Sequence, residues 1–270
     1  MRTKILLELG CNHQGSIEIA KEMILQAAKL GVWGVKFQKR TLSMIPKAAG
    51  EAKRDLKNSF GPTYFEHRDA LEFDYDQLKY LKDYATDLNL EFVCTAFDVP
   101  AIKKLAEFCE YIKLPSQKYS KKNYYEACLD LKNKIIVSTG MHTFKEIFKE
   151  NWIKSAWCVM HCNSIYPHNY ENYNLGILNT LLRARGSGVV GYSSHDDKGY
   201  GISLAVIAGA EIIERHFTLS KHMKGSDHST VSSDFEEMQD IIKRIEEAEK
   251  AMGIKDILAD EEQKMAERFK

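Results

Sequence analysis

The chain has 270 residues, in which 38 lysine and arginine residues balance 38 aspartate and glutamate residues. Because no net charge remains, no overall field would attract nucleic acid or an anionic membrane, and any anionic ligand must be held by local charges. The sequence shows no hydrophobic signal region at its start and no run of about 18 apolar residues. We therefore expect a cytoplasmic protein with neither a nucleic-acid nor a membrane partner.

Short apolar runs alternate with amphipathic segments along the whole chain. The expected strands cover residues 5–9, 33–38, 90–96, 111–115, 134–138, 157–161, 189–193 and 211–215. The expected helices cover residues 16–30, 75–88, 101–110, 122–131, 144–151, 175–183, 201–210 and 234–252. Residues 39–75 are polar, irregular and too long for an ordinary connection, which favours a functional loop.

Eight strand-then-helix units predict a parallel sheet covered by helices. We expect an α/β protein with a single-domain (β/α)8 TIM barrel over residues 1–254 and a charged tail over residues 255–270. A doubly wound open sheet is the alternative. It is disfavoured because no glycine-rich dinucleotide fingerprint follows the first strand.

Six cysteines are present, and none of them forms a CxxC pair. Most lie inside apolar runs, which is typical of reduced thiols rather than of a disulfide framework or a zinc site. We expect buried or half-buried free thiols. A nucleophilic role for Cys162 is the weaker hypothesis, because the sequence offers it no evident partner arrangement.

In a (β/α)8 barrel, the chemistry lies at the carboxyl ends of the strands, above an interior that apolar side chains fill. Every expected strand delivers at least one polar or ionisable side chain to that end. In chain order these are Glu8, Lys36, Gln38, Thr95, Asp98, Lys113, Ser116, Ser138, Thr139, His161, Asn163, Tyr166, Ser193, Ser194, His195, Glu214 and His216.

Two of these side chains are lysines flanked by apolar residues, Lys36 in VKF and Lys113 in IKL. A buried lysine carries a heavy desolvation cost unless an anion compensates its charge. Two such lysines at one mouth suggest a phosphorylated ligand, to which the nearby hydroxyl groups would be accessory donors. The alternative is that the lysines pair with internal carboxylates such as Glu8 or Glu214.

His195 and His216 follow the last two expected strands, so both imidazoles would emerge at the same end of neighbouring strands. Two neutral nitrogen ligands leave several coordination positions for water and substrate oxygens. That suits a Lewis-acid divalent ion better than a closed structural zinc. The sequence therefore predicts a metal site here. The alternative is that each histidine is a hydrogen-bonded residue of the core or the rim.

Short motifs in the expected strand ends, in the same order along the chain, resemble those of the sialic acid synthase (N-acetylneuraminate synthase) family. They are ELGCNHQG at 8–15, VKFQ at 35–38, CTAFD at 94–98, KLPS at 113–116, VSTGM at 137–141, HC at 161–162, YP at 166–167, GYSSH at 191–195, ERHFT at 214–218 and GSDH at 225–228. The chain departs from the family at Lys118, where an acidic residue is usual, and at Ser194, where aspartate is usual.

The resemblance implies a barrel that condenses phosphoenolpyruvate with an N-acylated aldose, such as N-acetylmannosamine or a related diacetamido hexose. The products would be a nine-carbon 2-keto acid and phosphate, and the cofactor would be a divalent metal, Mn²⁺ or Mg²⁺. It implies that His195 and His216 bind the metal and act in catalysis together with Glu8. The residues implied to hold phosphoenolpyruvate are Lys36, Thr95, Lys113, Ser116, Ser138 and Ser193, and those implied to contact the sugar are Gln38, Tyr166 and Asp227.

The resemblance covers the barrel only. Family members continue past a charged linker, which residues 260–270 resemble, into a small antifreeze-like domain whose arginine reaches the active site of a partner subunit. We expect this chain to consist of the barrel without such a domain and to form a homodimer, with a separate capping chain as another way to complete the site.

Two other functions stay open. One is an enzyme like the 3-deoxy-ald-2-ulosonate phosphate synthases, which would need a second basic cluster for a sugar phosphate, and Lys118, Lys121 and Lys122 are its candidates. The other is a barrel without turnover that serves as a binding or assembly partner.

Overall fold

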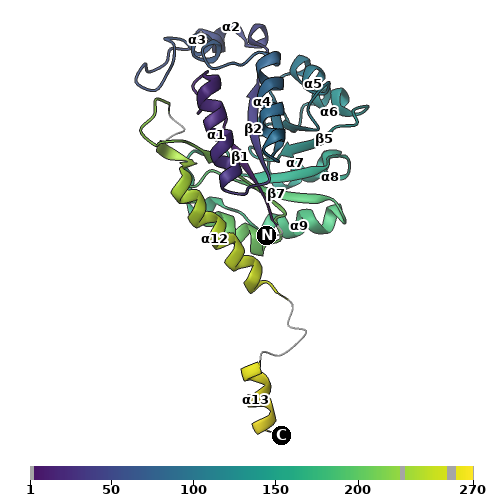
Figure 1. The fold of residues 1–270 in the computed structure, drawn as a ribbon. Helices are drawn as coiled ribbons and strands as arrows, with labels where there is room; N and C mark the ends of the chain where they lie inside the picture. Colours follow the sequence, from purple (N-terminus) through teal and green to yellow (C-terminus); the bar gives the residue numbers. More distant parts are fainter. Residues whose placement is uncertain (1–2, 226–228, 254–259, 270) are drawn as a thin grey trace.

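The computed structural model describes residues 3–225, 229–253 and 260–269. Its strands, in chain order, are β1 (Lys4–Glu8), β2 (Gly34–Lys39), β3 (Glu91–Ala96), β4 (Tyr111–Leu114), β5 (Lys134–Ser138), β6 (Cys158–Cys162), β7 (Val189–Ser194), β8 (Ile212–Phe217) and the two-residue β9 (Ser232–Ser233). Each strand pairs in parallel with the next, and β8 pairs with β1, which closes the barrel (Figure 1). The expected (β/α)8 barrel is confirmed. The alternative of a doubly wound open sheet is wrong, because β1 and β8 would be unpaired edge strands there, whereas they pair with each other in this structure.

Helices surround this barrel, and most lie within a few residues of their expected positions. They are α1 (Ile17–Lys29), α2 (Lys47–Gly50), α3 (Tyr64–Asp69), α4 (Tyr75–Asp87), α5 (Val99–Leu105), α6 (Lys122–Cys128), α7 (Phe144–Lys149), α8 (Trp152–Ser155), α9 (Gly176–Arg185), α10 (Tyr200–Ile207) and α12 (Phe235–Ala251). A further helix, α13 (Asp260–Arg268), comes later in the chain. Side-chain caps fix several starts. Asp74 and Gln77 form a reciprocal capping box at α4, for example, which satisfies two backbone N–H groups that have no helical partner.

The segment between β2 and α4 is more ordered than the sequence predicts. It contains α2, α3 and a short 3₁₀ turn, η1 (Leu42–Met44), and an antiparallel bridge joins Lys53 to Thr63. Periodicity misses these elements because helices of four to six residues are too short to show a repeating apolar face. The segment lies at one end of the barrel, where α2 and α3 stand beyond the other helices (Figure 1).

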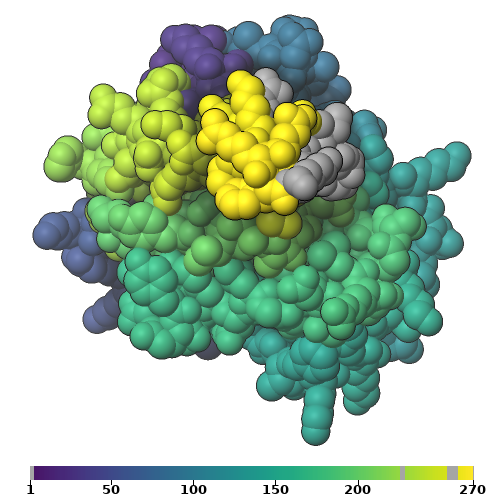
Figure 2. Space-filling view, turned by 90° about the horizontal axis from the view of Figure 1, so that it is seen from below, coloured from purple at the N-terminus to yellow at the C-terminus, as the bar shows by residue number. Residues whose placement is uncertain are grey.

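The helix expected after β7 is present as α10. Leu204 and Ile207 are about half exposed, and α10 buries Gly201, Ile202, Ala205 and Val206. Because α10 is apolar nearly all round, periodicity cannot tell which side faces the barrel. In the space-filling view, α12 in yellow-green borders the green part of the chain that contains α10 (Figure 2), and the two helices pack together.

All six cysteines are free, five of them buried and Cys11 partly exposed, which confirms that expectation. Over the described ranges, no helix has the length and apolar character needed to cross a membrane. Of the expected charged tail, residues 255–259 and 270 lie outside the described residues, and α13 occupies Asp260–Arg268.

Candidate active site

Strand alternation separates an apolar barrel floor from a polar mouth. We use "barrel floor" for the interior cluster Leu6, Val93, Tyr111, Ile136, Cys158, Met160 and Ile212. Because successive side chains on a strand point to opposite faces, the residue two positions further along points into the same interior. These next residues include Glu8, Thr95, Lys113, Ser138 and Glu214. The same alternation that builds the floor thus brings the polar residues together above it.

A cavity of about 320 Å³ opens at this end, and we call it the charged cavity. Its walls contain every residue to which the family resemblance assigns a site role and that the structure describes. These are Glu8, Lys36, Gln38, Thr95, Lys113, Ser116, Ser138, Tyr166, Ser193, His195 and His216. Asp227 lies outside the described residues. The structure therefore brings the expected set together, while what each residue binds stays a prediction.

Lys36 is almost fully buried and is surrounded by acceptors. Its ammonium group pairs with the Glu8 carboxylate, donates to Oγ1 of Thr95 at 2.9 Å, and lies 3.8 Å from Oε1 of Glu214. Burial lowers the pKa of Lys36, but Glu214 and Glu8 outweigh it, so that its pKa is raised. Lys36 is therefore a fixed positive charge in the cavity wall.

Lys113 is held in the same way from the other side. Its Nζ donates to both carboxylate oxygens of Glu214 at 2.7 Å, and the Ser193 hydroxyl donates to Oε1 of Glu214 at 3.1 Å. Burial raises the pKa of Glu214, but Lys113 and Lys36 lower it to about 2. The alternative considered above, internal pairing of both lysines with Glu8 and Glu214, is what the structure shows.

The His195 ring is oriented by the backbone. Its Nδ1 lies 2.6 Å from the Asn163 carbonyl oxygen, so it carries the proton, and Nε2 is left as an acceptor that faces the Tyr166 hydroxyl at 2.9 Å. Burial and the neighbouring His216 lower the pKa of His195 well below its usual value, which keeps the ring neutral. A neutral imidazole whose other N–H is held by a carbonyl is the form that ligates metals.

The two histidines are placed to share a ligand. Their ring centroids are 5.5 Å apart, and both side chains line the charged cavity. Within the described part of the chain, no cluster of three or more histidine, cysteine or acidic side chains could hold a metal ion. The donor set present therefore fits an ion that completes its coordination with water or substrate oxygens rather than a closed structural site.

The residue before His195 faces away from the cavity. Ser194 is fully buried and donates to Asp196, which also forms an ion pair with the fully buried Arg215 at 3.2 Å. Arg215 further donates to the Ser233 hydroxyl at 2.9 Å. This network ties the ends of β7 and β8 together, and it thereby supports His195, which follows β7, and His216, which lies in β8 next to Arg215.

Hydroxyl groups line the cavity beside the lysines. The Ser138 hydroxyl is buried and has no hydrogen-bond partner among the described residues, whereas that of Ser116 lies 3.2 Å from the Cys162 sulfur. A buried hydroxyl without a partner is costly, and such groups are usually satisfied by a ligand or an ordered water. Ser138 is therefore a donor available to an anion between Lys36 and Lys113.

The sequence analysis did not predict the two arginines in the wall of the charged cavity, Arg40 and Arg68. Arg40 follows β2, and Arg68 lies on α3, far along the segment that was expected to be a functional loop. The length and polarity of that segment were the available signal, but they identify no particular residue.

Asp98, which was expected near the mouth, caps the start of α5 and accepts from the backbone and hydroxyl of Thr41 at 2.6 and 2.8 Å.

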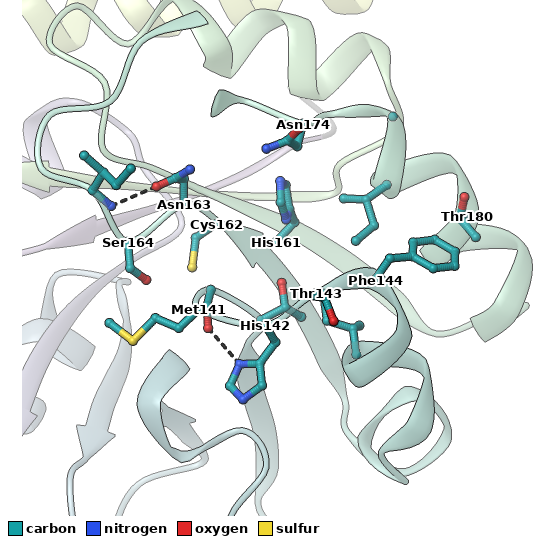
Figure 3. Close-up of a pocket in the computed structure, with 16 residues that line it drawn as sticks. Met141, His142, Thr143, Phe144, His161, Cys162, Asn163, Ser164, Asn174 and Thr180 are labelled. Carbon is teal, nitrogen blue, oxygen red and sulfur yellow. Dashed lines mark hydrogen bonds between the residues drawn. The ribbon is translucent and has the colours of Figure 1, made fainter. Parts of the chain in front are cut away.

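A second, larger cavity of about 890 Å³ lies beside the first, and Cys162 borders both. Figure 3 shows His161, which was expected at the mouth, among its lining residues together with Phe144 and Thr180. His161 lies on the outer face of β6 and donates through Nε2 to the Tyr173 carbonyl at 2.9 Å. Among the described residues, the larger cavity has no lysine, arginine or acidic side chain in its lining, whereas the charged cavity contains all three kinds.

Gly10 shapes the cavity wall next to Glu8. Its φ is +45°, and a Cβ atom there would lie 2.6 Å from Oε1 of Glu8. We expect Gly10→Ala to destabilise the fold by about 1–3 kcal/mol and to lower turnover about tenfold or more, because Glu8 must shift. Thermal unfolding and a product assay would measure both effects.

Gly31→Ala is the matched control. Gly31 has a φ of +66° but no atom within 4 Å of the added Cβ, so the variant should lose stability while its turnover stays near the parent value. Equal loss of turnover in the two variants would contradict the role given to the Glu8 contact.

Known proteins match this chain over most of its length. Residues 23–256 match the NeuB family. The chain is 34% identical over 256 residues to N-acetylneuraminate-9-phosphate synthase of Mus musculus, which is 92% of this chain and 71% of the relative. It is 32% identical over 261 residues to N,N'-diacetyllegionaminic acid synthase of Legionella pneumophila, covering 92% of this chain and 73% of that one.

A solved structure agrees with these matches. The N-acetylneuraminic acid (sialic acid) synthetase of Leptospira borgpetersenii superposes with a TM-score of 0.85 at 29% identity, over 99% of this chain and 91% of that one. These relatives are synthases of sialic and legionaminic acids, as the strand-end motifs suggested. By the extent of the family match and the identity of its relatives, the chain belongs to the NeuB family.

Proposed function

We propose that this chain condenses phosphoenolpyruvate with an N-acylated aldose to give a nine-carbon 2-keto acid and phosphate. The observation that carries the proposal is the charged cavity, in which two buried lysines, a group of hydroxyls and two histidines meet at the carboxyl end of the barrel. The sialic and legionaminic acid synthases among its relatives support the same class of reaction.

Phosphoenolpyruvate would lie against Lys36 and Lys113. Its phosphate and carboxylate are attached to one carbon, so both anionic groups need donors within a small volume. The hydroxyl groups of Thr95, Ser116, Ser138 and Ser193 line that volume. The Glu8 and Glu214 carboxylates already neutralise the lysines, so these side chains are held in place before the ligand arrives, and little reorganisation is needed on binding.

His195 and His216 are proposed to hold the divalent metal, Mn²⁺ or Mg²⁺. When bound, the ion would act as a Lewis acid on the aldehyde oxygen of the open-chain sugar. The Asn163 carbonyl fixes the His195 tautomer in advance. The Tyr166 hydroxyl and the Gln38 amide line the same cavity and are proposed to orient the sugar beside it.

The proposed reaction forms one carbon–carbon bond and releases phosphate. C3 of phosphoenolpyruvate attacks the aldehyde carbon, which becomes an alcohol, and water adds to C2, where cationic charge develops. Glu8 is the candidate base for that water, because its carboxylate lies in the cavity wall and is oriented by Gln38 at 2.7 Å. Collapse of the tetrahedral carbon at C2 then expels phosphate and leaves the 2-keto acid.

A phosphate-release assay with phosphoenolpyruvate, N-acetylmannosamine and Mn²⁺ tests this proposal. We expect release that depends on both substrates, together with formation of a 2-keto acid, and no release without an aldose. If a panel of N-acyl aldoses releases no more phosphate than the aldose-free control, the assignment is wrong. Tight phosphoenolpyruvate binding by calorimetry without any product would instead favour a barrel that has lost turnover.

A further inference from the structure

The Tyr166 side chain lies against both proposed metal ligands. Its ring centroid is 4.0 Å from that of His195 and 6.0 Å from that of His216. Its hydroxyl lies 2.9 Å from Nε2 of His195, and all three side chains line the charged cavity. Tyr166 therefore shares one small space with the two histidines, although about half of its surface is exposed.

The contact involves a single lone pair of His195. Nδ1 of the ring carries the proton that faces the Asn163 carbonyl at 2.6 Å, so Nε2 holds the lone pair of the ring that can accept. The Tyr166 hydroxyl donates to this lone pair, whereas the Ser193 hydroxyl, 3.5 Å from the same nitrogen, lies closer to Oε1 of Glu214 at 3.1 Å. A divalent ion bound by His195 needs the same lone pair. The hydroxyl and the ion thus exclude each other at Nε2.

The backbone on both sides of Tyr166 is fixed to His195 itself. The Asn163 carbonyl accepts from the His195 ring, and the His168 backbone N–H donates to the His195 carbonyl at 3.3 Å. Rotation of the Tyr166 side chain breaks neither of these bonds. The hydroxyl can therefore leave Nε2 while the backbone between β6 and α9 keeps its place around the metal ligand.

We propose that the Tyr166 hydroxyl and the divalent ion compete for Nε2 of His195, so that metal binding displaces the hydroxyl and frees it for the sugar. The inference rests on the proposed function, which gives the metal to His195 and His216 and a sugar contact to Tyr166. One O–H group donates one hydrogen bond, so it cannot hold His195 and the sugar at the same time. Metal binding therefore comes before the sugar contact and prepares it.

Calorimetric titration with Mn²⁺, in the absence of phosphoenolpyruvate, tests the competition without any turnover. We expect Tyr166→Phe to bind Mn²⁺ about 2- to 10-fold more tightly than the parent, because the hydrogen bond that the ion must break is absent. In the phosphate-release assay, the same variant should have a higher KM for N-acetylmannosamine, because the sugar contact is lost. General damage to the fold would weaken both kinds of binding, so the opposite signs identify the competition.

Tyr166→Leu is a second test variant, because it lacks both the hydroxyl and the ring, and it should also bind Mn²⁺ more tightly than the parent. Tyr170→Phe is the matched control. Tyr170 belongs to the same segment, is exposed, and is absent from the described lining of both cavities. Its Mn²⁺ affinity and its KM for the sugar should equal those of the parent.

The outcomes separate this inference from the proposed function. If Tyr166→Phe and Tyr166→Leu, shown by thermal unfolding to be folded, bind Mn²⁺ as the parent does or more weakly, the competition is refuted and the proposed function stands. If neither the parent nor the variants bind Mn²⁺, the metal assignment in the proposed function fails, and this inference fails with it.

Discussion

Replacing Lys113 with methionine is expected to lower the free energy of unfolding by about 3–5 kcal/mol and to abolish turnover. The Lys113 ammonium group contacts both oxygens of Glu214, and both side chains are at least 94% buried. Without its partner, the Glu214 carboxylate would remain as a buried charge with less compensation, which is one of the largest single-residue penalties in proteins. Urea unfolding would measure the loss of stability, and phosphate release the loss of turnover.

A double variant separates the two effects of this substitution. Lys113→Met combined with Glu214→Leu removes the buried pair together, and replacing a buried pair with apolar side chains is often close to neutral. We expect the double variant to regain most of the stability lost by Lys113→Met but none of the turnover. If it regains turnover as well, Lys113 acts only through the fold and not on phosphoenolpyruvate.

An exposed pair serves as the control for the stability measurement. Lys104 lies 3.1 Å from Glu107, with both side chains more than half exposed. Lys104→Met should change the free energy of unfolding by at most about 1 kcal/mol, because solvent screens the pair. A loss as large as that of Lys113→Met would contradict the explanation by burial.

Replacing His216 with alanine is expected to lower turnover at least about a hundredfold and to weaken Mn²⁺ binding. The reason is that one of two proposed metal ligands is lost, and Lewis-acid stabilisation contributes several kcal/mol to such a reaction. Calorimetric titration with Mn²⁺ would measure binding independently of turnover. Thermal unfolding would show whether the variant, whose side chain is 93% buried in the parent, still folds.

His142→Ala is the control for this experiment. His142 lies outside the charged cavity, where its ring nitrogens contact the Gly140 carbonyl and the Ser120 hydroxyl. Its Mn²⁺ affinity and turnover should match those of the parent. Unchanged Mn²⁺ binding in a folded His216→Ala variant would show that the metal is held elsewhere.

The sequence predicted the barrel because regular alternation is a local property. Eight apolar strands and their helices can be recognised from neighbouring residues alone, and parallel strands joined by helices have few stable arrangements. The strand-end motifs then identified the charged cavity, since strands of a barrel all present their carboxyl ends at one mouth. Lys36, Lys113, His195 and His216 are identified in this way from the sequence alone.

Local pattern could not decide which face of a strand turns inward. β6 reads as a continuous buried run, so the sequence placed His161 at the mouth, whereas the barrel interior receives Cys162 and His161 lies in the neighbouring cavity. A strand buried on both faces has no polar side to mark its phase. Only the register of β6 with β5 and β7 determines which of its side chains point into the barrel.

What the sequence by itself determined is the architecture and the kinds of group that collect at one end of the barrel. What only the tertiary structure decided is their pairing. Lys36 pairs with Glu8 and Glu214, and Lys113 pairs with Glu214. Glu214 is 178 residues from Lys36 and 101 residues from Lys113 in the sequence, and closure of the barrel brings these side chains together. Arg68 reaches the cavity because the segment between β2 and α4, residues 40–74, folds back over the mouth, and no local preference encodes where such a segment returns.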